Sequence, residues 1–232
     1  MHSKGQKKVL DLACGKGGDI KKWQRTGIEL YHGIDIAQVS IDHFKERLDD
    51  VRPSFKVNLS VSDGFAKPFF LGLFDLISCQ FALHYAFESS KVLCQALDNV
   101  SANLKSNGLF FGTIADGSAI QSSNLSNSVY KIQFAQEASN SPFGRKYTFE
   151  LVDAIDSCPE YLSNRMVLEA MAEERGLSLI YYQSFKDFYL RHAEENLEML
   201  ERMKVTENHR MMLSRDELEV AELYSAFCFQ KK

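Results

Sequence analysis

The chain has 232 residues, of which 45% are hydrophobic and 12% aromatic, which predicts a single domain spanning residues 1–232 with a buried core. The formal net charge of −4 argues against a general nucleic-acid coat, because non-specific affinity depends on many phosphate contacts. No apolar run reaches the ~18 residues that span a bilayer, and the N-terminal stretch has no apolar signal region. Five cysteines without a C-x-x-C pair predict free thiols in a reducing compartment.

The first predicted strand, residues 9–12, leads into a turn of small residues. Gly15, Gly17 and Gly18 leave the backbone of this turn without side-chain bulk, so a flat cofactor can lie on it and bind its N–H groups. Asp19 opens a short predicted helix. By itself, this pattern also fits an ordinary tight turn between a strand and a helix.

A second strand, predicted at residues 29–35, ends in Asp35, twenty residues after Gly15. A strand, a glycine turn, a helix and a second strand ending in an acid form the layout in which that acid binds ribose hydroxyls. The pattern is not that of a dinucleotide enzyme or a P-loop, because Asp11 lies inside the first strand and no Gly-Lys-Ser/Thr follows.

Helical spacing of apolar residues predicts a helix at 38–51, and alternation predicts a strand at 55–61. This strand leads to Asp63, whose carboxylate is positioned to accept a hydrogen bond from an adenine amino group. The alternative is that Asp63 only forms a turn with Gly64.

A nearly continuous apolar run at 73–79 predicts a buried central strand. A long amphipathic helix follows, stopped at 106–108, before a fifth strand at 109–114. This alternation predicts a doubly wound α/β sheet, whose ligands bind outside the carboxyl ends of its strands. Four residues that follow strand ends are therefore expected at one rim: Asp35, Asp63, Gln80 and His84.

The second half of the chain has a polar, Ser/Asn-rich segment at 115–140, interpreted as a surface insertion or flap, and an alternating strand at 143–151. Ser157 and Glu160 have the spacing of a capping box, which predicts that a helix starts there. Two closing strands are expected at 179–185 and 224–229, with acidic helices near 193–204 and 214–223 between them.

Five blocks stand in order along the chain: Leu-Asp-Leu-x-Cys-Gly-Lys-Gly-Gly-Asp, Gly-Ile-Asp-Ile-Ala-x-Val-Ser-Ile, Ser-Cys-Gln-Phe-x-x-His-Tyr-x-Phe-Glu-Ser, Phe-Gly-x-Lys-Tyr-x-Phe-x-Leu and Cys-Pro-Glu-Tyr-Leu. The first resembles motif I of the class I S-adenosylmethionine-dependent methyltransferases. Together the blocks resemble the cellular mRNA cap (guanine-N7) methyltransferases. The resemblance covers nearly the whole chain and implies a mostly parallel, seven-stranded Rossmann-like sheet, with 115–150 as an insertion on the substrate side.

The resemblance also implies a role for individual residues. The S-adenosylmethionine contacts it implies are Asp11, Gly15, Asp19, Asp35, Ile36, Asp63, Gly64 and Gln80. The residues it implies around the cap guanine are His84, Tyr85, Phe149, Glu160 and Tyr224, with Lys16 and Arg47 near the cap triphosphate. It further implies a nuclear enzyme, monomeric and without a metal or membrane, that acts on capped RNA and works with other capping enzymes or an activating subunit.

The chemistry agrees with these roles. Guanine presents N1–H and N2–H₂ donors together, and the Glu160 carboxylate can accept from both. Guanine N7 carries a lone pair and loses no proton on methylation, so we expect catalysis by alignment, with no general base. His84 would therefore orient the guanine. Without the resemblance, other interpretations stay open: a core pair for His84 and Tyr85, a helix cap for Glu160, sheet core for Phe149 and Tyr224, and a solvated side chain for Arg47.

The sequence departs from the family pattern in three places. Ala13 stands where the family usually has glycine, and Ala115 where a proline commonly follows the fifth strand. The family's segment before the first strand, which helps to hold cap and cofactor, is absent, so we expect this chain alone to bind S-adenosylmethionine weakly. The competing hypotheses are a class I methyltransferase with a small-molecule acceptor, and a non-catalytic cap-binding module.

Overall fold

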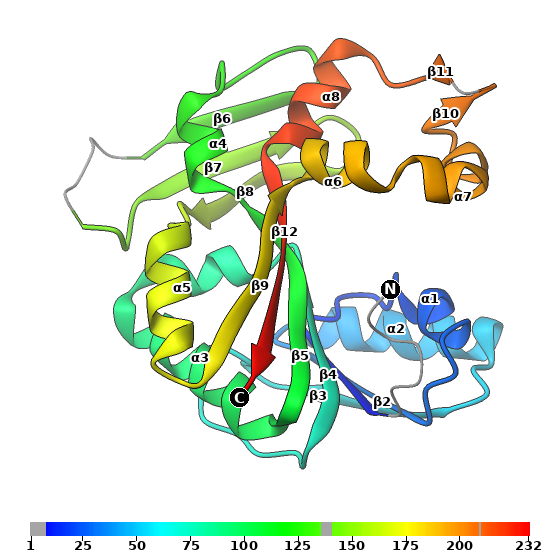
Figure 1. Ribbon diagram of the computed structural model, residues 1–232, viewed down its shortest axis with the longest axis vertical. Helices are drawn as coiled ribbons and strands as arrows, with labels where there is room; N and C mark the ends of the chain where they lie inside the picture. The colour runs from blue at the N-terminus through cyan, green and yellow to red at the C-terminus, as the bar shows by residue number, and fades with distance from the viewer. Residues whose placement is uncertain (1–7, 136–140, 209) are drawn as a thin grey trace.

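The computed structural model describes residues 8–135, 141–208 and 210–232 (Figure 1). The N-terminal stretch and residues 136–140 of the expected insertion lie outside the described residues. Within the described ranges, no helix is long and apolar enough to cross a membrane.

A seven-stranded sheet in the order β3-β2-β1-β4-β5-β12-β9 forms the centre of the fold. Neighbours from β3 to β5 run parallel, whereas β12 is antiparallel to both β5 and β9. The predicted doubly wound, mostly parallel sheet is thus confirmed. Its strands are β1 (Lys8–Leu12), β2 (Leu30–Asp35), β3 (Lys56–Val61), β4 (Phe74–Gln80), β5 (Leu104–Ala115), β9 (Leu177–Ser184) and β12 (Tyr224–Lys231).

Helices cover both faces of this sheet because its central strands β1 and β4 present buried side chains to both sides. On one face, α1 (Ile20–Gln24) and α2 (Gln38–Val51) pack over a core that includes Val9, Phe44 and Leu76. On the other face, α3 (Ser90–Asn103) and α5 (Arg165–Glu173) cover the larger core (Figure 1). The boundaries predicted for α2 agree with the structure, because its apolar spacing alone defines the buried stripe.

The fifth strand begins earlier than predicted. Residues 104–108 belong to β5 and do not form a separate turn, since Leu104 already pairs with Phe74. The register shifts between Phe74 and Leu76, and Asn107 has a φ of 62°. The Ser-Asn-Gly signal therefore marks an irregularity at the start of a strand.

The segment after β5 folds into a second, smaller sheet above the main one (Figure 1). It contains α4 (Gly117–Ser122) and the antiparallel strands β6 (Tyr130–Phe134), β7 (Lys146–Leu151) and β8 (Ile155–Tyr161). Tyr130, Ile132, Tyr147 and Phe149 form a core with Leu223 from the end of the chain. The insertion predicted from its polar composition thus has a buried core of its own.

The helix start predicted at Ser157 and Glu160 is wrong. Residues 155–161 form β8, in which Tyr147 of β7 is the partner of Glu160. The helix begins later, at Arg165, where the Asn164 side chain accepts a hydrogen bond from the Val167 N–H. Pairing with β7 overrides the local capping signal.

The closing strands confirm the prediction, and the segment between them is more broken than expected. It contains α6 (Phe185–His192), the 3₁₀ turn η2 (Glu194–Asn196), α7 (Leu197–Arg202), the short strands β10 (Thr206–Glu207) and β11 (Arg210–Met211), and α8 (Arg215–Glu222). The acidic helix expected near 193–204 is divided between η2 and α7, with the separate helix α6 before it, and a true capping box at Ser214 and Glu217 starts α8. Another 3₁₀ helix, η1 (Leu83–Glu88), follows β4.

Candidate cofactor and guanine sites

The carboxyl ends of β1 and β2 are joined by the side chain of Asp35. Its Oδ2 accepts a hydrogen bond from the Gly15 N–H at 2.8 Å, and its Oδ1 accepts one from the Ala37 N–H at 2.9 Å. A carboxylate has about four acceptor positions, so each oxygen keeps one for a ligand. Ile36, next in the chain, is 70% exposed and offers an apolar surface beside this acid. The arrangement suits a ribose with an aromatic base next to it.

The glycines of the turn after β1 have different tasks. A Cβ on Gly17 would lie 2.3 Å from the Phe44 ring, so this glycine allows the turn to pack on α2. A Cβ on Gly15 or Gly18 would meet no atom within 4 Å, which leaves open space beside the backbone. Ala13 has a φ of 56°, in the left-handed region that favours glycine. That conformation is one that glycine would adopt with less strain, in agreement with the glycine that the resemblance leads us to expect here.

Asp11 lies beneath this turn, and its carboxylate is only 4% exposed. The Tyr31 hydroxyl donates a hydrogen bond to its Oδ2 at 2.6 Å. Burial raises the pKa of Asp11 to about 7; the Tyr31 hydrogen bond opposes this, and the negative charges of Asp19 and Asp35 add to it. A neutral Asp11 is therefore available near physiological pH, and a cation bound close by would favour its ionised form.

The other proposed cofactor residues lie at the ends of β3 and β4. Asp63 Oδ1 accepts hydrogen bonds from the N–H groups of Phe65 and Ala66, both at 2.9 Å, so it does shape the turn that includes Gly64. Gln80 accepts a hydrogen bond from Thr113 at 3.2 Å and donates one to the Ser78 hydroxyl at 3.0 Å.

Asp19, at the start of α1, forms an ion pair with Lys22. All eight proposed cofactor residues belong to β1, β2, β4 or the segments that follow β1, β2 and β3, as the topology requires.

The proposed guanine residues come from four separate segments. His84 and Tyr85 lie on η1, and the centroids of their rings are 4.5 Å apart. Nε2 of His84 is 3.5 Å from Oε1 of Glu160 on β8. Phe149 on β7 contacts Tyr224, the first residue of β12, edge to face at 6.4 Å. The structure thus brings together residues that lie up to 140 positions apart in the chain.

His84 and Glu160 form the polar centre of this group. The side chain of His84 is 1% exposed, and neither ring nitrogen has a hydrogen-bond partner in the part of the chain that the structure describes. Burial by itself raises the pKa of Glu160, but the His84 ring and the Tyr147 hydroxyl lower it more, so the net shift is downward. An ionised acceptor therefore lies 3.5 Å from Nε2 of a buried imidazole, whose Nδ1 has no partner among the described residues.

Three aromatic residues surround this centre. The Tyr85 hydroxyl lies 3.2 Å from Sγ of Cys158, and burial raises the pKa of Tyr85 well above its usual range. Burial and the charge of Glu160 likewise raise the pKa of Tyr224, so both tyrosines keep their protons at neutral pH. The Phe149 ring is 2% exposed and belongs to the core of the small sheet.

Lys16 and Arg47, the proposed phosphate ligands, line one pocket of about 450 Å³ with Lys21 and His43. It lies between the glycine turn with α1 and the second half of α2, and the acids Glu46 and Asp50 also contribute to its wall.

Two residues at these sites received no role from the sequence. Phe81 follows Gln80 with a φ of 52°, is 50% exposed and contacts the Tyr224 ring at 5.2 Å. Tyr147 donates a hydrogen bond to Oε2 of Glu160 at 2.6 Å. Both belong to motif blocks, but neither the exposure of Phe81 nor the hydrogen-bond partner of Tyr147 can be predicted from the local pattern.

Ala115 is buried, and its carbonyl accepts a hydrogen bond from Ser163.

Solved structures share this fold at low sequence identity. An S-adenosylmethionine-dependent methyltransferase from Clostridium acetobutylicum matches with a TM-score of 0.60 and 14% identity, over 97% of this chain and 84% of that one. The CcbJ methyltransferase from Streptomyces caelestis matches with a TM-score of 0.63 and 11% identity, over 97% of this chain and 83% of that one. The fold is that of the class I methyltransferases.

Sequence comparison identifies the family. The mRNA (guanine-N(7))-methyltransferase domain matches residues 2–232. The mRNA cap guanine-N(7) methyltransferase of Schizosaccharomyces pombe is 36% identical over 97% of this chain and 68% of its own length. The mRNA cap guanine-N(7) methyltransferase 1 of Arabidopsis thaliana is 36% identical over 97% of this chain and 69% of its own length. The Saccharomyces cerevisiae enzyme is 34% identical over 96% of this chain and 59% of its own length.

The chain belongs to the mRNA cap guanine-N7 methyltransferase family and is an S-adenosylmethionine-dependent methyltransferase.

Proposed function

We propose that this chain methylates N7 of the 5′-terminal guanosine of GpppN-RNA, by in-line transfer and without a general base. S-adenosylmethionine supplies the methyl group as an electrophilic sulfonium. The observation that carries the proposal is the buried pair of His84 and the ionised Glu160, in which Nε2 faces the carboxylate at 3.5 Å and Nδ1 has no hydrogen-bond partner within the described part of the chain. A buried polar group without a partner costs free energy, so this pair is suited to a ligand with several hydrogen-bonding groups.

The guanine edge fits this pair chemically. Glu160 accepts from N1–H and N2–H₂, while His84 orients the base. Tyr85, Phe149 and Tyr224 supply aromatic surface, and base–aromatic stacking contributes about 1–3 kcal/mol per base. Because N7 already carries its lone pair, what remains for the protein is to hold N7 in line with the methyl group and to exclude water.

On the cofactor side, Asp35 holds the ribose, Asp63 and Gln80 face the adenine, and Asp11 and Asp19 lie toward the cationic end. Gly15 and Gly18 leave the space that the cofactor occupies, which supports this arrangement. Lys16 and Arg47 bind the triphosphate bridge. We further propose that residues 1–232 act as one monomeric domain in the nucleus, with 115–150 on the substrate side and with capping enzymes or an activating subunit as partners.

The test is methyl transfer from labelled S-adenosylmethionine to GpppA- or GpppG-capped RNA, with pre-methylated cap as the control acceptor. Label on the unmethylated cap alone, lost in Glu160→Ala, supports the proposal. Label on a small molecule in competition, with none on the cap, favours the small-molecule alternative. Cap binding without turnover favours the non-catalytic module.

A further inference from the structure

Glu160 has a rigid neighbour to which no role has been given so far. Tyr147 lies directly opposite Glu160 in the β7–β8 pair, and its hydroxyl donates a hydrogen bond to Oε2 at 2.6 Å. Both residues are buried, Tyr147 at 1% and Glu160 at 5% exposure. We propose that Tyr147 is a positioning residue that orients the Glu160 carboxylate for the N1–H and N2–H₂ edge of the cap base. This inference rests on the proposed function.

The geometry explains why such a residue is needed. The terminal torsion of a glutamate is broad, so a carboxylate without a fixed partner can rotate. The Tyr147 ring cannot follow such a rotation, because it is packed in the core of the small sheet and contacts Phe134 at 6.0 Å. Its hydroxyl occupies one of the two acceptor positions of Oε2. The plane of the carboxylate is thereby set, and acceptor positions on both oxygens remain for the base.

After the larger effect of the His84 ring, the same hydrogen bond also lowers the pKa of Glu160 and so favours the ionised form that guanine requires. An ionised carboxylate only accepts hydrogen bonds, which suits the N1–H and N2–H₂ donors of guanine. A protonated carboxylate has an O–H donor, which would face those donors. The titratable groups that face Glu160 are His84 and Tyr85 from η1, Tyr147 from β7 and Tyr224 from β12. Burial and the charge of Glu160 raise the pKa of Tyr147 far above neutrality, so Tyr147 stays a donor.

Base selectivity is the consequence that separates positioning from general support of the fold. Hypoxanthine has the N1–H of guanine but lacks its N2 amino group. If Tyr147 orients the Glu160 carboxylate so that it accepts from both N1–H and N2–H₂, loss of the Tyr147 hydroxyl should lower methylation of the guanine cap more than methylation of the hypoxanthine cap. A purely structural role would lower activity on both caps by the same factor.

The experiment compares wild type with Tyr147→Phe on GpppA-RNA and on IpppA-RNA, which carries inosine in place of guanosine. We expect kcat/KM for the guanine cap to fall about 10- to 100-fold, the range for a hydrogen bond to a charged group, mainly through KM for the cap. The KM for S-adenosylmethionine is expected to stay unchanged. The guanine-over-hypoxanthine preference should fall several-fold.

The pH profile is a second readout. Because the Tyr147 hydrogen bond lowers the pKa of Glu160, its removal raises that pKa. As the pH is lowered, the Tyr147→Phe variant should therefore lose cap methylation at a higher pH than wild type does. In a Glu160→Gln background, Tyr147→Phe should have little additional effect, since Tyr147 acts through Glu160.

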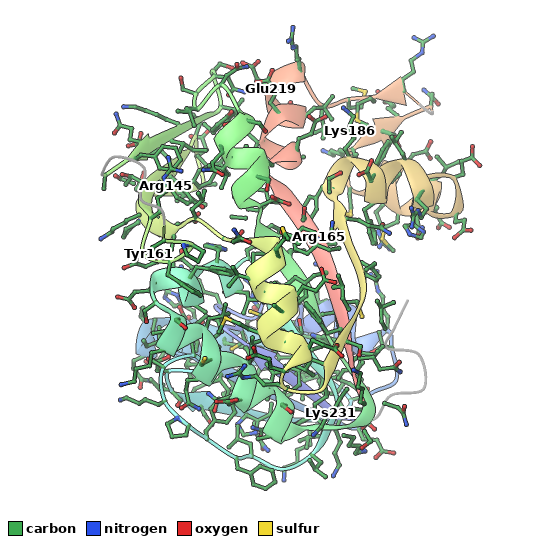
Figure 2. All side chains as sticks on the ribbon, turned by 60° about the vertical axis from the view of Figure 1, so that its left-hand side comes forward. Arg145, Tyr161, Arg165, Lys186, Glu219 and Lys231 are labelled. Carbon is green, nitrogen blue, oxygen red and sulfur yellow. The ribbon has the colours of Figure 1, made fainter. Side chains whose placement is uncertain are left out.

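The chain provides a matched control on the same strand. Tyr161, labelled in Figure 2, follows Glu160 directly, and its hydroxyl donates to Oε1 of Glu88 at 3.3 Å. Tyr161→Phe removes the same kind of hydrogen bond without touching the guanine residues, so cap kinetics should match wild type. If Tyr147→Phe folds poorly, Tyr147→Met, which also lacks the hydroxyl, replaces it with the same expectations.

The outcomes separate this inference from the proposed function. Wild type that leaves capped RNA unmethylated overturns both. An active wild type whose Tyr147→Phe variant keeps its KM for the cap and its base preference overturns the inference alone. Equal losses on both caps, or a full additional loss in the Glu160→Gln background, also overturn it.

Discussion

Two buried carboxylates of this protein each accept a hydrogen bond from a tyrosine hydroxyl, but their pKa values are shifted in opposite directions. Asp11 on the cofactor side accepts from Tyr31, and Glu160 on the guanine side accepts from Tyr147, each at 2.6 Å. The pKa of Asp11 is raised to about 7, whereas that of Glu160 is lowered. The hydrogen bond from tyrosine therefore cannot be what decides the charge state.

Burial and the remaining neighbours decide it, and burial is the largest cause of the raised pKa of Asp11. Asp11 has Asp19 and Asp35 nearby, and both charges work against its ionisation in addition to burial. Glu160 has the His84 ring beside it, which together with the hydroxyl outweighs burial. Around Asp11, the negative charges repel one another, and a cationic ligand would reduce that repulsion. Glu160, by contrast, is already ionised and can accept hydrogen bonds from a neutral ligand. Substitutions at the two sites should therefore have effects of different kind and size.

The largest effect concerns the stability of the ligand-free protein. Because the folded chain keeps a proton on Asp11 where the unfolded chain has lost it, stability falls as pH rises from about 4 through 7. Asp11→Asn removes this dependence. We expect the free energy of unfolding of wild type to fall by roughly 4 kcal/mol more than that of Asp11→Asn between pH 4 and 8. Denaturant unfolding at several pH values measures it; parallel curves for the two proteins would contradict the raised pKa.

Removing the charge of Glu160 should chiefly affect the acceptor substrate. Glu160→Gln replaces an acceptor that faces two donors with an amide that also presents a donor. We expect kcat/KM for capped RNA to fall roughly 100-fold, equivalent to about 3 kcal/mol, with S-adenosylmethionine affinity unchanged. Initial rates with a cofactor titration test this. Equal loss of cofactor affinity would show that the two sides are not separable.

Tyr31→Phe tests the cofactor-side pair. The ring keeps its edge contact with Phe44 at 5.8 Å, but the ionised Asp11 loses its donor. We expect a loss of about 2 kcal/mol in stability at pH 8 and a smaller loss at pH 5, where Asp11 is protonated in both proteins. Unfolding of the two single variants and of Tyr31→Phe/Asp11→Asn forms a double-mutant cycle. A loss of equal size at both pH values would contradict the role of the charge.

The smallest effect is expected at Ala13. Its φ of 56° costs a non-glycine residue about 1 kcal/mol, of which part is offset by the flexibility of glycine in the unfolded chain. Ala13→Gly should raise the melting temperature slightly. Gly18→Ala, at a negative φ with open space around its Cβ, serves as the stability control in the same turn. A lower melting temperature for Ala13→Gly would mean that the turn is not strained.

Much of the fold could be predicted from the sequence because its signals are local. The apolar spacing of 38–51 and the apolar run at 73–79 led to α2 and β4 within one residue of their observed ends. Parallel strands bring their carboxyl ends to one rim, so the proximity of Gly15 and Asp35 also followed from topology. The motif blocks identified the family, and the resemblance named the proposed guanine residues, of which Phe149 and Glu160 lie on the second sheet.

The tertiary structure alone decided the rest. Residues 155–161 carry a helix-start signal and still form a strand, because β7 pairs with five of these seven residues and shares a core with them. The role of Tyr147 depends on a register between two strands, and the charge of Asp11 and Glu160 depends on which residues surround each of them. A sequence pattern reports the preferences of neighbours along the chain, whereas burial and charge act between residues that only the folded chain brings together.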